Sequence, residues 1–192
     1  NSACTSDEMQ AVSREISPLM SQHSDDITMN AALFKRVKYV YDHQSEEKLD
    51  KEQKKLLEET YKSFVRSGAN LSADKQEQLR KLNQEISMLQ LTFGQNMLAE
   101  TNAFQLVIDN KDDLAGLPKN LIASSAEVAK ERGLDGKWVF TLHNPSVMPF
   151  LQYSDRRELR ERMYKGYISR GCQGGKNDSR EVVKKLVKAR LE

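Results

Sequence analysis

The three histidines of the chain do not have the spacing of a zinc-binding helix. His23, His43 and His143 have no second histidine three to five residues away, and no H-E-x-x-H sequence occurs. Glu46 and Glu47 follow His43, so one imidazole and two carboxylates could bind a metal weakly. A solvated helix end explains these residues better. We therefore expect no metal site in this chain.

The two cysteines give no indication of a reactive or structural site. Cys4 and Cys172 lack the close cysteine partners of a zinc site, and a nucleophilic cysteine needs a base that the sequence does not indicate. Cys172 lies in the Gly-rich segment 171–176, which superficially resembles a phosphate-binding loop. The segment lacks the G-x-x-x-x-G-K-[ST] spacing and follows a predicted helix instead of a strand. We interpret it as a helix–helix connection, and expect neither a catalytic nor a cofactor-binding residue.

Basic residues are concentrated in the last part of the sequence. Residues 155–192 hold 12 Lys and Arg against six acids, which gives +6, while residues 1–110 hold 13 basic and 17 acidic residues, which gives −4. Such a segment could bind an acidic partner or nucleic acid. Glu158, Glu161 and Glu181 are interleaved at helical spacing, however, as on a solvated helix face. The net charge of +2 for all 192 residues argues against a general nucleic-acid or membrane-surface binder.

A mainly helical fold must position these residues. Gly and Pro make up only 13 of the 192 residues, and the first 67 residues contain no Gly and a single Pro. Apolar residues recur there at intervals of three and four, which predicts long helices. No run of about 18 apolar residues occurs, so we expect no membrane-spanning segment.

The first two helices are predicted from their cap residues. Thr5 and Glu8 have capping-box spacing at the start of the first helix, and Pro18 is expected to end or kink it. The second helix is expected over 30–44, with Asn30 as its cap.

The next two helices have clearer boundaries. Asp50 and Gln53 form a capping box for the third, and Gly68 suits the left-handed position after its end. The fourth is predicted over 72–102 from an apolar seam with heptad spacing. Gly94 interrupts this seam, and we expect it to mark close packing.

The periodicity then changes from helical to alternating. In segments 104–108 and 138–142 large apolar residues stand at every second position, and both segments are rich in aromatic and β-branched side chains, which predicts two short antiparallel strands. Segment 118–132 between them is predicted to be a helix that stops at Gly133. Residues 104–143 are therefore expected to form a small β-α-β insert.

Two basic helices are predicted to complete the chain. Asp155 and Glu158 have capping-box spacing for a helix that ends near Arg170, and Asp178 is expected to start the last helix. The apolar residues expected to point inward on that helix are Val182, Val183, Leu186, Val187 and Leu191. The last helix has no terminator before Glu192. This is expected either if the chain is cut in or just after that helix, as one piece of a larger protein, or if a terminal helix simply frays.

The predicted fold is therefore mainly α, a helical bundle or array with a small two-stranded antiparallel insert. We divide it into a long-helix region at 1–103, the insert at 104–143 and truncated basic C-terminal helices at 144–192. Together these regions are expected to form one structural unit of a larger chain.

Several motifs are specific enough to indicate a family. Together they resemble the thimet-oligopeptidase (neurolysin-like) metallopeptidases, and in particular the N-terminal half of the bacterial peptidyl-dipeptidases. The motifs cover nearly the whole chain: YKSFVRSGANL (61–71), FGQN (93–96), ETNAF (100–104), DLAGLP (113–118), WVFTL (138–142), PS (145–146), PFL (149–151), and RELRE (157–161) with Tyr164, Tyr167 and Arg170.

The resemblance implies a zinc-dependent enzyme with a mostly helical fold around a deep channel. In that family two histidines of an H-E-x-x-H helix and a downstream Glu hold the zinc, and the motif Glu acts as general base on zinc-bound water. None of these residues is present here. No catalytic, cofactor-binding or metal-binding residue can therefore be carried over, and the zinc ligands are expected in the missing part of the parent protein.

The resemblance implies that this chain is a non-catalytic N-terminal portion of such a peptidase. It would form part of the channel wall that limits substrates to short peptides, and be inactive alone. Its partners would be those peptides and the missing catalytic half, and the uncovered apolar faces would favour self-association. We expect a cytoplasmic location, with the periplasm as the alternative. The competing hypothesis is a stand-alone helical module that binds an acidic partner through its basic C-terminal helices.

Overall fold

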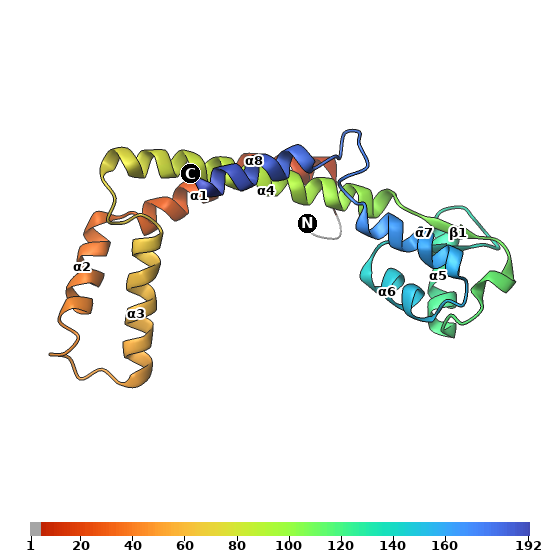
Figure 1. Ribbon diagram of the computed structural model, residues 1–192, viewed down its shortest axis with the longest axis horizontal. Helices are drawn as coiled ribbons and strands as arrows, with labels where there is room; N and C mark the ends of the chain where they lie inside the picture. Colours follow the sequence, from red (N-terminus) through yellow and green to blue (C-terminus); the bar gives the residue numbers. More distant parts are fainter. Residues whose placement is uncertain (1–4) are drawn as a thin grey trace. The chain divides into compact units, whose positions relative to one another are not determined.

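The computed structural model describes residues 5–192 and is mainly helical, with one two-stranded antiparallel sheet (Figure 1). This confirms the predicted fold class. Two compact units are present: one runs to Thr92 and also includes Lys184–Glu192, and the other is Phe93–Val183. The division into three regions remains a prediction. The elements are α1 (Asp7–Thr28), α2 (Ala31–Asp42), α3 (Lys51–Arg66), α4 (Ala73–Ala103), β1 (Leu106–Ile108), the 3₁₀ helix η1 (Lys111–Leu114), α5 (Lys119–Glu131), β2 (Trp138–Phe140), α6 (Asn144–Tyr153), α7 (Arg157–Ile168) and α8 (Arg180–Leu191).

The first helix has a different cap from the predicted one and continues past Pro18. Its cap is Ser6 instead of Thr5, since Ser6 Oγ accepts a hydrogen bond from the amide of Met9 (3.2 Å). Pro18 does not end α1, which continues to Thr28. Proline removes one backbone donor, but the turns beyond it are held by polar contacts with α4. Those contacts are a local reason for the helix to persist.

Helices α2 and α3 lie side by side as a hairpin (Figure 1) and begin at the predicted caps. Asn30 caps α2, and Asp50 and Gln53 form the complete capping box of α3. The two helices are joined by stacked aromatic rings, with centroids 4.0 Å apart for Tyr41 and Tyr61 and 5.9 Å apart for Phe34 and Tyr61. Stacked rings combine a large buried area with a preferred geometry, which fixes how the helices face each other.

Helix α4 begins and ends within one residue of its prediction. Its seam residues up to Thr92 are half-buried, and few apolar side chains of the first unit are fully buried, Met29 and Ala69 among them. Gly94 does not mark close packing: a Cβ built there meets no described atom within 4 Å. That expectation was wrong, because a glycine in a helical seam need not face a neighbour.

The second unit contains the main hydrophobic core. The two strands are antiparallel, as predicted, and Leu106 pairs with Phe140 and Ile108 with Trp138. Helix α5 packs against β2, and α6 against α7. The fully buried side chains include Leu106, Phe140, Leu142, Val147, Phe150 and Met163.

Two glycines of this unit are required by close approaches. Gly116 has φ 83°, and a Cβ there would lie 2.2 Å from the carbonyl oxygen of Tyr153. Gly166, in α7, lets the ring of Phe104 approach to where a Cβ would be 2.4 Å away. These contacts hold the η1–α5 turn and α7 against their neighbours, so both positions exclude larger residues.

The C-terminal helices begin later than predicted. Helix α7 starts at Arg157 without a side-chain cap, so Asp155 and Glu158 form no capping box. Asp155 instead donates its amide N–H to the carbonyl of Ala115 (2.9 Å), a long-range contact that the local spacing does not indicate.

The predicted inward face of α8 is partly wrong. Val182 and Leu186 are half-buried and Ala189 is buried, whereas Val183, Val187 and Leu191 are 40%, 52% and 82% exposed. A spacing of 3–4 residues from Val182 defines the covered face, and the other apolar residues lie outside it. Over the described part of the chain, no helix is long and apolar enough to cross a membrane.

Candidate functional site

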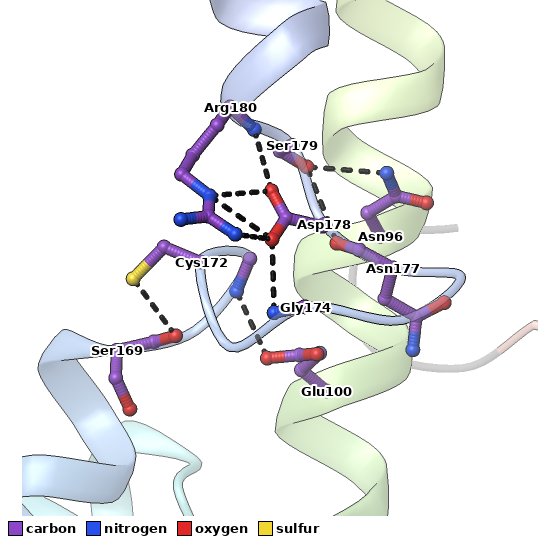
Figure 2. Close-up of polar contacts among 10 residues, drawn as sticks. Asn96, Glu100, Ser169, Cys172, Gly174, Asn177, Asp178, Ser179 and Arg180 are labelled. Carbon is purple, nitrogen blue, oxygen red and sulfur yellow. Dashed lines mark hydrogen bonds and ion pairs between the residues drawn. The ribbon is translucent and has the colours of Figure 1, made fainter.

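The most developed polar cluster lies where the α7–α8 loop rests on α4 (Figure 2). The amide of Gly171 donates to Glu100 Oε2 (2.9 Å), and Asn96 Nδ2 donates to Ser179 Oγ (3.1 Å). Ser179 also donates its amide to the carbonyl of Gly171 (2.7 Å), which closes the loop. Two side chains one turn apart on α4 therefore hold both ends of the loop.

Asp178 braces the same loop from within. Its Oδ2 accepts from the amide of Gly174 (2.9 Å), and its Oδ1 accepts from the amide of Arg180 (3.0 Å). The guanidinium of Arg180 also donates to both carboxylate oxygens, at 2.6 Å from Nη2 to Oδ2. These hydrogen bonds, above all those from the Arg180 side chain, lower the pKa of Asp178 below its ordinary range because they favour the charged carboxylate.

Two carboxylates, one on α4 and one at the end of the loop, make the loop unsuitable for a phosphate. Two loop amides, those of Gly171 and Gly174, already donate to Glu100 and Asp178, and both acceptors are carboxylates that repel an anion. Cys172 is exposed, and its Sγ donates to the carbonyl of Ser169 (3.2 Å). The segment therefore connects two helices, as predicted from its spacing.

Arg170 attaches the end of α7 to α4 beside this loop. Its Nη1 donates to Thr101 Oγ1 (2.9 Å), and its guanidinium carbon lies 4.0 Å from the centre of the Tyr167 ring. Such a cation–π contact orients the side chain while one face of the guanidinium stays against the ring. These contacts hold the end of α7 against α4, and they include no group arranged to bind a substrate.

The histidines make separate contacts. His43 stacks on Tyr39, with centroids 4.2 Å apart. His143 has Nδ1 3.1 Å from Thr141 Oγ1 and Nε2 3.2 Å from Asn102 Oδ1. Within residues 5–192, no three His, Cys, Asp or Glu side chains are arranged to hold a metal ion. The described residues therefore do not fit the zinc that the resemblance implies, and no catalytic step is derived through it.

A second polar feature lies in the first unit, between α1 and α4. Asp25 is only 6% exposed, and its Oδ1 accepts a hydrogen bond from Asn83 Nδ2 (2.8 Å). Its Oδ2 is buried and has no hydrogen-bond partner among residues 5–192. Burial raises the pKa of Asp25, against the opposing effects of the Asn83 hydrogen bond and the charge of Arg80.

The basic C-terminal segment is occupied in large part by intramolecular contacts. Arg156 is 3.0 Å from Asp113, and Lys165 is 2.6 Å from Glu161. Arg160 donates to the carbonyl of Ser154, and Arg170 and Arg180 are paired as described. These contacts favour solvated and intramolecular charge pairing over a surface for an acidic partner.

Comparison with known proteins identifies relatives of one kind. No family model matches the chain. It is 33% identical over 190 residues to a dipeptidyl carboxypeptidase of Escherichia coli K12, which covers 99% of this chain and 28% of that protein. It is 31% identical over 198 residues to an oligopeptidase A of Haemophilus influenzae, which covers 100% of this chain and 29% of that protein. A probable cytosolic oligopeptidase A of Arabidopsis thaliana is 29% identical over 191 residues.

The chain is thus homologous over nearly its whole length to peptidases. These relatives, dipeptidyl carboxypeptidases and oligopeptidases A, are members of the thimet-oligopeptidase family, which confirms the resemblance in the sequence motifs. The chain spans about 28% of the length of the dipeptidyl carboxypeptidases that it matches.

Sequence reasoning missed the residues that organise both polar features. Glu100 and Gly171 are 71 residues apart, and Asn83 and Asp25 are 58 apart. Contacts of this range have no periodic or capping signal. The heptad seam on α4 does indicate that its flanking polar residues lie near a packed neighbour, but not which neighbour.

Proposed function

We propose that this chain is the non-catalytic N-terminal portion of a zinc-dependent peptidyl-dipeptidase or oligopeptidase. It forms part of the wall of a channel that admits short peptides, and the zinc and its ligands belong to the rest of the parent protein. The chain alone is inactive. The cytoplasm is the compartment we propose for the parent, with the periplasm as the alternative.

The observation that carries this proposal is the pattern of the matches. They cover 96% or more of this chain in dipeptidyl carboxypeptidases and oligopeptidases A, but less than a third of each relative. The described residues form two compact units, and among them no three His, Cys, Asp or Glu side chains are arranged to hold a metal ion. On this proposal the chain supplies scaffold, and the chemistry of peptide cleavage comes from the rest of the parent protein.

A chimera tests the wall function. The matching part of the E. coli dipeptidyl carboxypeptidase is replaced with this chain, and cleavage of a short peptide is compared with cleavage of a long unfolded polypeptide. We expect the chimera to cleave the short peptide with added zinc and to leave the long polypeptide largely intact. The matched control is the relative with its matching part deleted.

Two outcomes contradict the proposal. One is a folded chimera that cleaves the long polypeptide as fast as the short peptide. The other is that the relative, after deletion of its matching part, keeps both its activity and its preference for short peptides. Adding this chain in trans to the deleted relative provides a second reading if the chimera does not fold.

A further inference from the structure

Asp25 is a buried acid whose hydrogen bonding is half complete. It projects from α1 and is bound on one oxygen by Asn83 of α4. The other oxygen, Oδ2, has no donor among the described residues. A buried polar atom that lacks a partner is costly, and a buried charge that lacks one costs considerably more.

Two grooves border this residue, but Oδ2 is closed off from both of them. One groove, of about 400 Å³, is also lined by Asp26, Glu77 and Arg80. The other, of about 580 Å³, runs past Arg66 at the end of α3. Because Oδ2 itself is buried, a solute in either groove does not reach it without separation of the helices. Binding of a proton, by contrast, adds no heavy atom to the closed site.

The surrounding charges do not neutralise Asp25. Arg80 is engaged with Asp26, with Nη1 2.7 Å from Oδ1. Lys81 lies 3.6 Å from Glu77, on the same turns of α4. Arg66 lines the second groove but makes no contact with the free oxygen. Desolvation therefore outweighs the attraction of Arg80, in agreement with the raised pKa of Asp25.

We infer that Asp25 is a proton-operated clasp between α1 and α4. A proton on Oδ2 makes the carboxyl neutral, so the contact with α4 closes without a buried charge. Loss of the proton leaves a buried carboxylate with one oxygen that lacks a donor, and this loosens the C-terminal half of α1 from α4. The inference goes beyond the proposed function and does not depend on it.

The direction of the pH effect follows from linkage. The pKa of Asp25 is higher in the folded chain than in the unfolded chain, so the folded chain holds the proton more tightly. The stabilising contribution of the protonated carboxyl is complete below the ordinary pKa of Asp, about 3.9. It is lost as pH rises through the pKa that Asp25 has in the folded chain. Each unit of separation between the two values changes the closed-to-open ratio by about tenfold.

Hydrogen exchange of the 192-residue chain tests the clasp. Protection factors, corrected for intrinsic exchange, are measured for Gln22–Thr28 from about pH 4 to about pH 8, a range that brackets a raised carboxyl pKa. In wild type we expect protection to fall as pH rises. Asp25→Asn, which keeps an acceptor for Asn83 but carries no charge, is expected to show constant protection that exceeds wild type near neutral pH.

Asp26→Asn is the matched control, since Asp26 is exposed and adjacent. This variant is expected to keep the fall in protection with rising pH but to move it to lower pH, because the Asp26 charge helps to raise the pKa of Asp25 and its loss releases Arg80. The inference is overturned if Asp25→Asn retains the wild-type pH dependence. It is also overturned if NMR titration of the Asp25 carboxyl carbon in wild type gives a pKa at or below the ordinary pKa of Asp. That titration decides the matter even if a variant does not fold.

Discussion

At the scale of single residues, two helical glycines have different surroundings that the sequence does not distinguish. Gly166 and Gly94 are both helical, yet Gly166 faces the Phe104 ring while Gly94 faces open space. Phe104 packs against the main core, so its ring has little freedom to retreat. The same substitution should therefore have opposite effects at the two positions.

We expect Gly166→Ala to lower the free energy of unfolding by about 1–3 kcal/mol, because the added methyl overpacks the contact with Phe104. Gly94→Ala, the matched control, should raise it by up to about 1 kcal/mol through helix propensity. Urea denaturation of both variants measures these changes. Equal effects at the two positions would show that the close approach at Gly166 has no energetic weight.

Asp178 gives a second residue-scale prediction, with a pH dependence opposite to that of Asp25. Its lowered pKa means that the folded chain prefers the charged carboxylate. The stabilisation from the charged carboxylate is present above the ordinary pKa of Asp, about 3.9. It is lost as pH falls through the lower pKa of Asp178 in the folded chain.

We expect Asp178→Asn to speed hydrogen exchange at the amides of Gly174 and Arg180 at neutral pH. The amide of Ser169, which follows the end of α7 and donates to the carbonyl of Lys165, should be unaffected. Unchanged exchange at both amides would show that their hydrogen bonds to Asp178 do not stabilise the loop.

At the scale of elements, the features predicted correctly were those set by neighbours in sequence. The capping box at Asp50, the cap at Asn30, the limits of α4 and the antiparallel strands all depend on local spacing. The failures depend on distant partners. Helix α1 continues past Pro18, where its later turns contact α4. The amide of Asp155 donates to the carbonyl of Ala115. The covered face of α8 depends on neighbours that its own sequence does not indicate.

The same reasoning covers the candidate site. That segment 171–176 joins two helices could be predicted, because its glycine spacing is wrong for a phosphate loop. Its anchoring by Glu100 and Asn96, and the buried state of Asp25, could not be, since each requires the tertiary arrangement of two helices.

The capping box of α3 gives the element-scale prediction. Asp50→Ala removes the acceptor for the amide of Gln53 (2.8 Å) and should cost about 1 kcal/mol of stability. Lys51→Ala, at the next position, is the control and should change stability little. Thermal unfolding followed by circular dichroism compares the two. An unaffected Asp50→Ala variant would contradict the role of the cap.

At the scale of the whole molecule, the first unit leaves apolar surface uncovered. Met9, Val12, Ile16, Leu19 and Met20 of α1 are between 47% and 62% exposed and recur at helical spacing. An amphipathic helix normally buries such a stripe against a partner. Under the proposed function, the rest of the parent protein would cover this stripe.

In the isolated chain this stripe should cause self-association. Sedimentation velocity is expected to show larger species as concentration rises, and the double variant Ile16→Ser, Leu19→Ser should reduce them. Leu56→Ser, an exposed apolar position on α3, is the control and should behave as wild type. A wild-type chain that stays monomeric at high concentration would contradict the expectation.

Under the proposed function, this chain provides scaffold and no catalytic or zinc-binding residue. The most direct measurement is made on the purified 192-residue chain with added zinc: bound metal is quantified, and release of dipeptides from a short peptide is followed. The account predicts no stoichiometric zinc and no cleavage above the buffer rate. Stoichiometric zinc together with sustained peptide cleavage by the chain alone would contradict it.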